Sequence, residues 1–147
     1  MNERRSFMRN KKKDRSQAQT LIFEAQPGKC PKCGRNLGIV QTRERFIITF
    51  NGMYHVFSKD RGCRNTACEN YMKVYYRPLE EIQLALNDLE FGLDILIYIG
   101  ETYLQENKST PEIHKLLTEK FEVDICEKTV GNLLKIYLAL THCVDAD

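Results

Sequence analysis

Hydrophobic and polar positions follow a different period in each half of the chain. In the first half, β-branched and aromatic residues gather in two short runs, "RFIITF" (45–50) and "MYHVF" (53–57), on either side of Asn51 and Gly52. An Asn-Gly pair between such runs is a strong signal for a β-hairpin, because both central residues of a type I′ turn need positive φ. A further run, "YMKVYY" (71–76), predicts a third strand. This half is therefore predicted to form a small antiparallel sheet of three strands.

Beyond Pro78 the hydrophobic residues recur at steps of three and four, which is the period of an amphipathic helix. The first such helix is predicted to place four residues on one face: Leu79, Ile82, Leu86 and Leu89. Gly92 opens a second apolar segment, "LDILIYIGETYL". The change of period predicts an α+β fold, in which a small sheet precedes an all-helical domain.

Two more helices are predicted after these, joined by a short connection. The first begins at "STPEIHKLL", where Ser109 and Glu112 have the spacing of a capping box and Pro111 suits the first turn. The second starts near Cys126. The connection, "FEVDI" (121–125), directs two apolar residues inward, and helices joined so tightly predict a helix-turn-helix.

Helical geometry divides this last helix into two faces. The apolar face holds Cys126, Val130, Leu133, Leu134, Tyr137 and Thr141, and the opposite face holds Lys128, Asn132, Lys135 and Ala139. Lysine and asparagine side chains on a solvent face can contact base edges or phosphates. We therefore expect DNA contacts from Lys128, Thr129, Asn132 and Lys135. The alternative is that this face is the solvated surface of a helical bundle.

Four of the six cysteines stand in two pairs with the spacing of metal ligands, Cys30-x2-Cys33 and Cys63-x4-Cys68. A Cys-Pro-Lys-Cys-Gly loop places two sulfurs on one side of an ion, and the hairpin between the pairs returns the chain so that the second pair completes a tetrahedron. Four free thiols packed as small hydrophobes are the alternative, but both pairs lie in polar, charged loops. The spacing predicts a zinc ribbon with one structural Zn²⁺ ion.

The other cysteines and the histidines have no partners at metal or catalytic spacing. Cys126 and Cys143 are expected to be packing thiols, and His55 is expected to pair across the hairpin or to face phosphate. His114 and His142 lie on predicted helices and receive no role. Because no His-Glu, Ser-His or carboxylate pair stands out, we predict neither an enzyme nor a small-molecule substrate.

The net charge of +2 conceals a strong polarity along the chain. Residues 1–77 carry seventeen Lys and Arg against six acids, a balance of +11, whereas residues 78–147 carry five against fourteen, a balance of −9. The basic half favours a polyanionic partner. The acidic balance argues against strong phosphate contact by the helical half, unless its lysines face the DNA.

Residues 1–20 are charged and aperiodic, which predicts a disordered basic arm, with a solubilising tail as the alternative. Its expected DNA contacts are Arg4, Arg5, Arg9, Lys11, Lys12, Lys13 and Arg15. The predicted domains are thus the arm, a zinc ribbon (25–77) and a helix-turn-helix domain (78–147). No apolar run reaches the ~20 residues of a membrane helix. No secretion core follows the basic start, so we expect a cytoplasmic protein.

The order of these motifs resembles the N-terminal region of a group of prokaryotic insertion-sequence transposases. The resemblance covers about residues 29–140 and is strongest in "GLDILIYIG", "EIHKLL" and "VDICEKTVGNLL", where the family tends to have Ser at the position of Cys126. In that group a zinc ribbon and a helix-turn-helix precede an RNase H-like catalytic core with an acidic triad. The resemblance implies binding of double-stranded transposon-end DNA, without catalysis because that core is absent from the sequence.

These observations predict a sequence-specific DNA-binding protein that recognises transposon-end or operator-like DNA. Two partner arrangements stay open, a homodimer or a separate transposase catalytic subunit. The alternative function is a zinc-stabilised protein-interaction adaptor whose acidic helical half binds a basic partner.

Overall fold

The predicted β-hairpin is present in the computed structural model, which describes residues 15–145. Strands β2 (Gly38–Thr49) and β3 (Gly52–Gly62) pair antiparallel along nearly their whole length. Thr49 pairs with Gly52, so the turn residues are Phe50 and Asn51, one position earlier than predicted. Gly52 alone of these takes a positive φ, +113°, which glycine adopts without the strain of a side chain.

The turn is shifted because Phe50 is drawn into the helical part of the molecule. Its ring lies 4.8 Å from that of Phe121 and 5.5 Å from that of Tyr98, measured between centroids. The neighbouring Ile48 amide donates to Glu90 O, and the Gly92 amide donates to Ile48 O, each at 2.8 Å. Tertiary packing at the tip of the hairpin therefore outweighs the local preference for an Asn-Gly turn.

Two shorter strands complete the four-stranded sheet of the described residues. Strand β1 (Gln19–Glu24) runs parallel to β3, and β4 (Tyr75–Tyr76) pairs antiparallel with Arg61 and Gly62 of β3. The prediction of a strand over the whole of 71–76 was wrong for its first four residues, which belong to the second cysteine loop. The arm was predicted to reach residue 20, but Gln19 and Thr20 already lie in β1.

The helices follow the predicted order. Three pack together, namely α3 (Leu93–Glu106), α4 (Thr110–Glu119) and α5 (Glu127–Asp145). The capping box of α4 is confirmed, since the Ser109 side chain accepts from the Glu112 amide and Glu112 reaches back to Ser109. The fold is therefore α+β, as predicted from the change of hydrophobic period.

Helix α2 (Leu79–Leu84) corrects the prediction of an apolar face along residues 79–89. It is a short helix, and its Leu79 and Ile82 are about half exposed. The side chain that it buries is Glu81, which is 2% exposed. An ion pair with the sheet, described below, turns this acidic residue inward and leaves the apolar ones in solvent.

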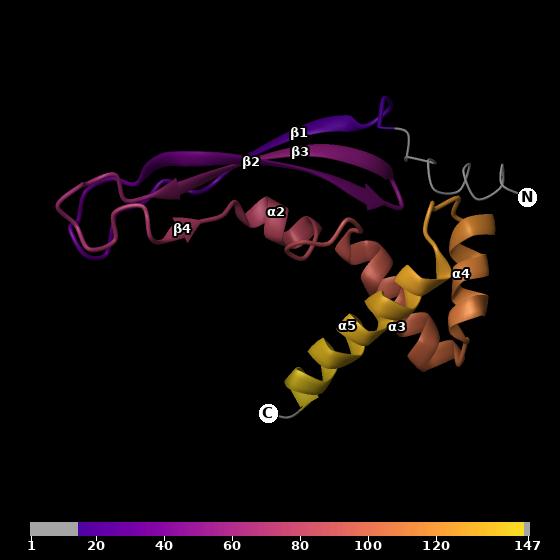
Figure 1. Ribbon diagram of the computed structural model, residues 1–147. Coiled ribbons are helices and arrows are strands. Elements are labelled where there is room, and N and C mark those ends of the chain that lie inside the picture. Colours follow the sequence, from indigo (N-terminus) through magenta and orange to yellow (C-terminus); the bar gives the residue numbers. More distant parts are fainter. Residues whose placement is uncertain (1–14, 146–147) are drawn as a thin grey trace, which may run out of the picture.

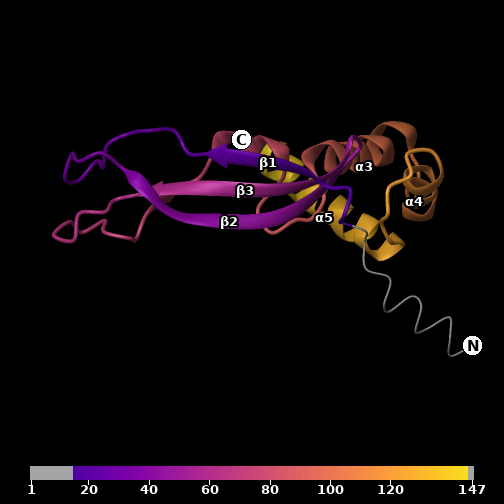
Figure 2. The same ribbon diagram turned by 90° about the horizontal axis from the view of Figure 1, so that it is seen from above.

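The hairpin joins two ends of an elongated molecule (Figures 1 and 2). At its tip, Ile48 belongs to the main hydrophobic core, together with buried residues of α3, α4 and α5. At the other end, the two cysteine loops lie away from those helices (Figure 1). A second buried cluster there contains Cys30, Leu37 and Cys63.

Candidate metal centre and DNA-contacting residues

The first cysteine loop is a tight turn between Cys30 and Gly34. The Gly34 amide donates to Cys30 O at 2.8 Å, and the Cys30 amide donates to Arg35 O at 2.9 Å. Gly34 has a φ of +74°, a conformation that disfavours any residue with a Cβ. The glycine that follows Cys33 in the sequence is therefore required by the shape of this loop.

The second loop contains an extra turn that accommodates its longer spacing. The Cys68 amide donates to Asn65 O at 3.0 Å, and the Met72 amide donates to Cys63 O at 3.2 Å. The Asn70 amide points at Cys68 Sγ, 3.4 Å away. The four residues between the cysteines thus form a turn rather than a strand, and both sulfurs remain on one side of it.

The four sulfurs converge. All four Sγ atoms lie within 4.8 Å of one another. Cys30 Sγ is 3.8 Å from Cys68 Sγ, and Cys33 Sγ is 3.7 Å from Cys63 Sγ. A tetrahedron with zinc–sulfur bonds of ~2.3 Å has edges of ~3.8 Å, so this spacing fits a four-thiolate metal site. Among the described residues, the structure thus brings together all four predicted ligands in a site that could hold a metal ion.

Contact among the thiols separates their pKa values. The backbone amide of Cys33 lowers the pKa of Cys30 to about 6. The backbone amide of Asn65 acts to lower the pKa of Cys63, but burial and the three neighbouring sulfurs together raise it to about 12. One ionised thiol thus holds back the ionisation of another, as expected where several thiolates need a cation to share a site.

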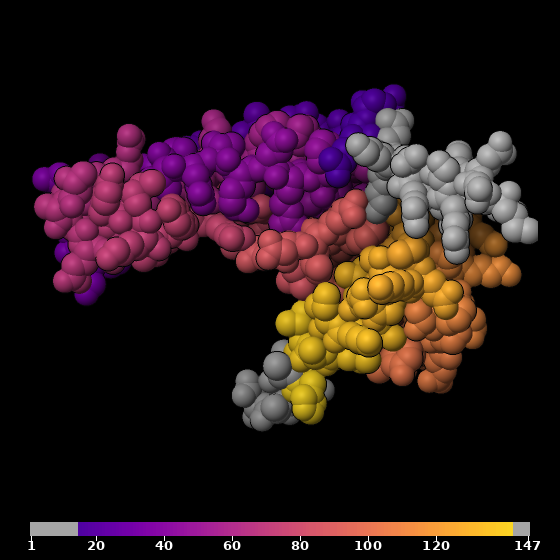
Figure 3. All heavy atoms as spheres, in the orientation of Figure 1, coloured from indigo at the N-terminus to yellow at the C-terminus, as the bar shows by residue number. Residues whose placement is uncertain are grey.

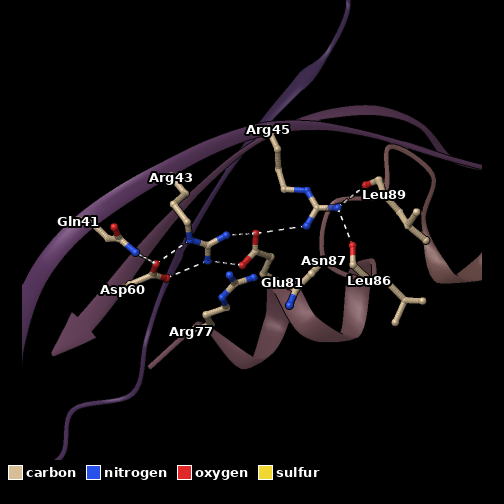
Figure 4. Close-up of polar contacts among 9 residues, drawn as sticks. All are labelled: Gln41, Arg43, Arg45, Asp60, Arg77, Glu81, Leu86, Asn87 and Leu89. Atoms are coloured by element: carbon tan, nitrogen blue, oxygen red, sulfur yellow. Dashed lines mark hydrogen bonds and ion pairs between the residues drawn. The ribbon is translucent and has the colours of Figure 1, made fainter. Parts of the chain in front are cut away.

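Sequence reasoning missed a network of buried charges between the sheet and α2 (Figure 4). The Arg43 guanidinium donates to both oxygens of Asp60, at 2.6 and 2.8 Å, and to both oxygens of Glu81, at 2.6 and 3.1 Å. The side chains of Asp60 and Glu81 are 0% and 2% exposed. Such bidentate pairs fix geometry as well as charge. The network is a structural link that holds α2 against β2 and β3.

Arg45 extends this link to the segment that follows α2. Its guanidinium lies 3.6 Å from Glu81 and donates to the carbonyl oxygens of Leu86 and Leu89 (Figure 4). A weak signal was available in the sequence, since Arg43 and Arg45 alternate along one strand and so share a face. Their partner Glu81 lies 38 residues beyond Arg43, and no local pattern indicates it.

The predicted face of α5 is exposed as expected. Lys128, Asn132 and Lys135 are exposed, whereas Val130, Leu133 and Leu134 are buried, as the helical period predicted. Thr129 is half-buried, and its hydroxyl lies 3.0 Å from Cys126 Sγ.

Two residues near the connection between α4 and α5 have surroundings that the sequence did not indicate. Cys126 was predicted on the buried face but is exposed, because it stands at the residue before the helix. His114, which received no role, places Nε2 at 2.9 Å from Ile125 O. That contact connects α4 to the end of the segment that leads into α5.

Most of the predicted arm contacts lie outside the described residues: Arg4, Arg5, Arg9, Lys11, Lys12 and Lys13. The Arg15 guanidinium lies over the Phe46 ring, 4.2 Å from its centroid, which is a cation–π geometry. Phe46 in turn stacks on His55 at 4.1 Å. The predicted cross-strand pairing of His55 is therefore observed, and Arg15 contacts its partner Phe46 of β2.

The chain matches no protein-family model, and no curated protein or solved structure shows significant similarity to it. The resemblance to transposases thus stays a prediction. Among residues 15–145, no helix combines the length and apolar character that a membrane crossing requires.

Proposed function

We propose that the protein is a zinc-stabilised, sequence-specific DNA-binding protein of the kind that recognises transposon ends or operators. The observation that carries the proposal is the cluster of four cysteine sulfurs at zinc spacing, placed in the basic half of the chain. Zinc with four thiolate ligands has no open position, so its role is to fold the loops around it. Exposed Lys29, Lys32, Arg35 and Arg64 surround the site and supply positive charge for phosphates.

In this proposal α4 and α5 act as a helix-turn-helix, with α5 in the major groove. The N-terminal residues of a recognition helix contact base edges. Lys128 and Asn132 are exposed in the first two turns of α5. Lysine suits the acceptors of guanine, and asparagine can bind adenine in a bidentate manner. Lys135 would contact the backbone, and the basic arm would add phosphate contacts.

The test is binding to DNA selected by the full-length, zinc-loaded protein from a random duplex library. We expect Asn132→Ala to weaken binding to the selected site by about 1–3 kcal/mol and to change binding to unrelated duplex little, because a bidentate base contact discriminates by that amount. Gln105→Ala on α3 is the matched control, since it removes an exposed amide outside the proposed interface. Equal losses on both DNAs, or no loss, would contradict a base-reading role for α5.

A protein-interaction adaptor is the second candidate, and one observation favours it. The acidic helical half exposes several large apolar side chains: Ile97, Tyr103, Leu104 and Leu140. Exposed apolar residues surrounded by acids suit a basic protein partner. A stable complex with a basic protein, in a molecule without salt-sensitive DNA affinity, would favour this function over the first.

A further inference from the structure

Residues 71–77, "YMKVYYR", form a continuous exposed segment with an unusual composition. All seven residues are exposed. Five of them are large and apolar or aromatic, at 36–42% exposure: Tyr71, Met72, Val74, Tyr75 and Tyr76. Single exposed hydrophobic residues are normal on a protein surface, but a contiguous group of this kind indicates a binding surface.

The segment is held in place by its surroundings. The amides of Tyr71 and Lys73 donate to Cys68 O and Asn70 O, each at 3.1 Å. The Tyr75 hydroxyl donates to Met72 O at 3.0 Å, and β4 pairs with β3. Residues 71–74 therefore belong to the second cysteine loop, and Tyr75 and Tyr76 are fixed by pairing with β3.

No other element covers this end of the molecule in the view of Figure 3, where the second cysteine loop and β4 form the outer left surface. Figure 1 places helices α3, α4 and α5 at the opposite end. A partner can therefore approach the segment without displacing any described part of the chain.

Charge identifies the partner. Arg64, Lys73 and Arg77 are exposed in and beside the segment, and the one acid between residues 64 and 77, Glu69, lies 4.0 Å from Lys32. Lysine is depleted from the cores of protein–protein interfaces, whereas here Lys73 stands between Tyr71 and Tyr75. Aromatic rings that stack on bases, combined with cations that follow the backbone, are the features of single-strand binding surfaces.

We infer that residues 71–77 bind an unpaired DNA strand by stacking bases on their tyrosines. Bases within a duplex are already stacked on each other, so these rings need unpaired nucleotides. The inference deepens the proposed DNA-binding function and rests partly on it, because it adds an unpaired strand to the duplex assigned to α5. The two surfaces lie on different elements, so single-strand and duplex binding are separable.

The experiment measures fluorescence anisotropy of a labelled dT12 strand and of the selected duplex with full-length, zinc-loaded protein. Tyr76→Leu keeps apolar area but removes the π face, and we expect it to weaken dT12 binding roughly 5- to 150-fold. Tyr76→Phe should bind dT12 within about twofold of the native chain, because it keeps the ring. Tyr103→Leu, an exposed tyrosine on α3, is the matched control and should leave dT12 affinity unchanged.

The outcomes separate this inference from the proposed function. Loss of dT12 binding by Tyr76→Leu with intact duplex binding supports the inference, and the reverse pattern is expected of Asn132→Ala. The inference is overturned if Tyr76→Leu binds dT12 as tightly as the native chain does. It is also overturned if the native chain binds the duplex but not dT12. If the Tyr76→Leu variant loses its metal, two other measurements replace it. One is dT12 binding by Tyr71→Leu, and the other is ultraviolet crosslinking of the native chain to dT12 that contains bromodeoxyuridine. Crosslinks outside residues 71–77 would overturn the inference.

Discussion

At the scale of single residues, glycines decide where the backbone can turn beside the cysteines. Gly34 has a φ of +74°, and a Cβ built there would meet no atom within 4 Å. Space is therefore free, and only the backbone conformation penalises a side chain. Gly28, just before the first cysteine, has no positive φ, and its Cβ would make ordinary contact with Leu37 at 3.7 Å.

This contrast makes a prediction about metal affinity. Gly34→Ala should weaken zinc binding by about 1–2 kcal/mol, roughly 5- to 30-fold, because left-handed backbone strains an alanine by that amount. Gly28→Ala should leave the affinity nearly unchanged. Competition for the metal with a chromophoric chelator measures both. Equal affinities for the two variants would show that the loop tolerates the strain and that the glycine is not needed for the site.

The convergence of the cysteines was predictable because their spacing and the hairpin signal are both local. The contacts of Arg43 were not, since its partners Asp60 and Glu81 come from another strand and from a helix. The apolar face predicted for residues 79–89 failed for the same reason, because it ignored an ion pair that turns Glu81 inward. Strand β1 was missed because it forms by parallel pairing with the distant strand β3, and its own apolar run is short.

At the scale of elements, α3 and α5 approach each other closely at Gly100. A Cβ at this position would lie 2.0 Å from the Tyr137 ring, whereas a Cβ at Gly131 of α5 would lie 3.8 Å from its nearest neighbour, Thr110. The same Gly→Ala substitution therefore probes two opposite situations. At Gly100 the Tyr137 ring occupies the space that a methyl group needs. At Gly131 the methyl group fits, and alanine raises the helix propensity of α5.

We expect Gly100→Ala to lower the free energy of unfolding by about 1–3 kcal/mol, because Tyr137 must move and α3 must separate from α5. Gly131→Ala should raise it by up to about 1 kcal/mol, the propensity difference in a helix interior. Urea denaturation followed by circular dichroism measures both. A stabilising Gly100→Ala would mean that the tyrosine finds another rotamer without loss.

A second element-scale prediction concerns the Arg43 network. Burial alone would raise the pKa of Asp60 and Glu81, but the hydrogen bonds and charge of Arg43 hold both below their ordinary values. Their stabilising effect is therefore fully present above the unfolded pKa of about 4 and is lost as the pH falls through the lower folded pKa. The native protein should lose stability below about pH 4.

Arg43→Met should lower the free energy of unfolding by about 3–5 kcal/mol at pH 7, because it leaves the buried Asp60 without its ion-pair partner and leaves Glu81 with Arg45 alone, 3.6 Å away. In the variant, burial raises the carboxylate pKa values, so its stability should improve as the pH falls towards 4. The difference between the two proteins should thus shrink in acid. Lys115→Met, on an exposed residue of α4, is the control and should show no such trend. If the difference in the free energy of unfolding between the native protein and Arg43→Met did not change with pH, Arg43 would act through packing alone.

At the scale of the whole molecule, the hairpin connects two parts that are stabilised by different interactions. The tip, with Ile48, belongs to a core of twelve buried residues, most of them from the helices and their connections. At the cysteine end, the buried cluster of the described chain consists of Cys30, Leu37 and Cys63, with Cys33 and Cys68 packed against it. Strand β2 separates the two ends by ~40 Å, at ~3.3 Å for each of its twelve residues.

If the four cysteines hold the proposed zinc ion, removing it should unfold the cysteine end of the hairpin and leave the tip folded. A structural metal contributes its binding free energy to the folding of the loops around it. Without the metal, Leu37 is the one buried side chain of this cluster that is not a cysteine, and its burial cannot replace that contribution. After chelation, or in Cys63→Ser, we expect the amides of residues 29–40 and 61–77 to lose protection. Those of residues 47–53 and of helices α3, α4 and α5 should keep theirs, because the helical core retains its apolar contacts. Hydrogen–deuterium exchange by mass spectrometry resolves these segments, and adding zinc back to the chelated protein should restore the first set. Uniform loss of protection would show that the whole chain folds as one cooperative unit, and unchanged protection of the cysteine loops would show that they fold without a metal.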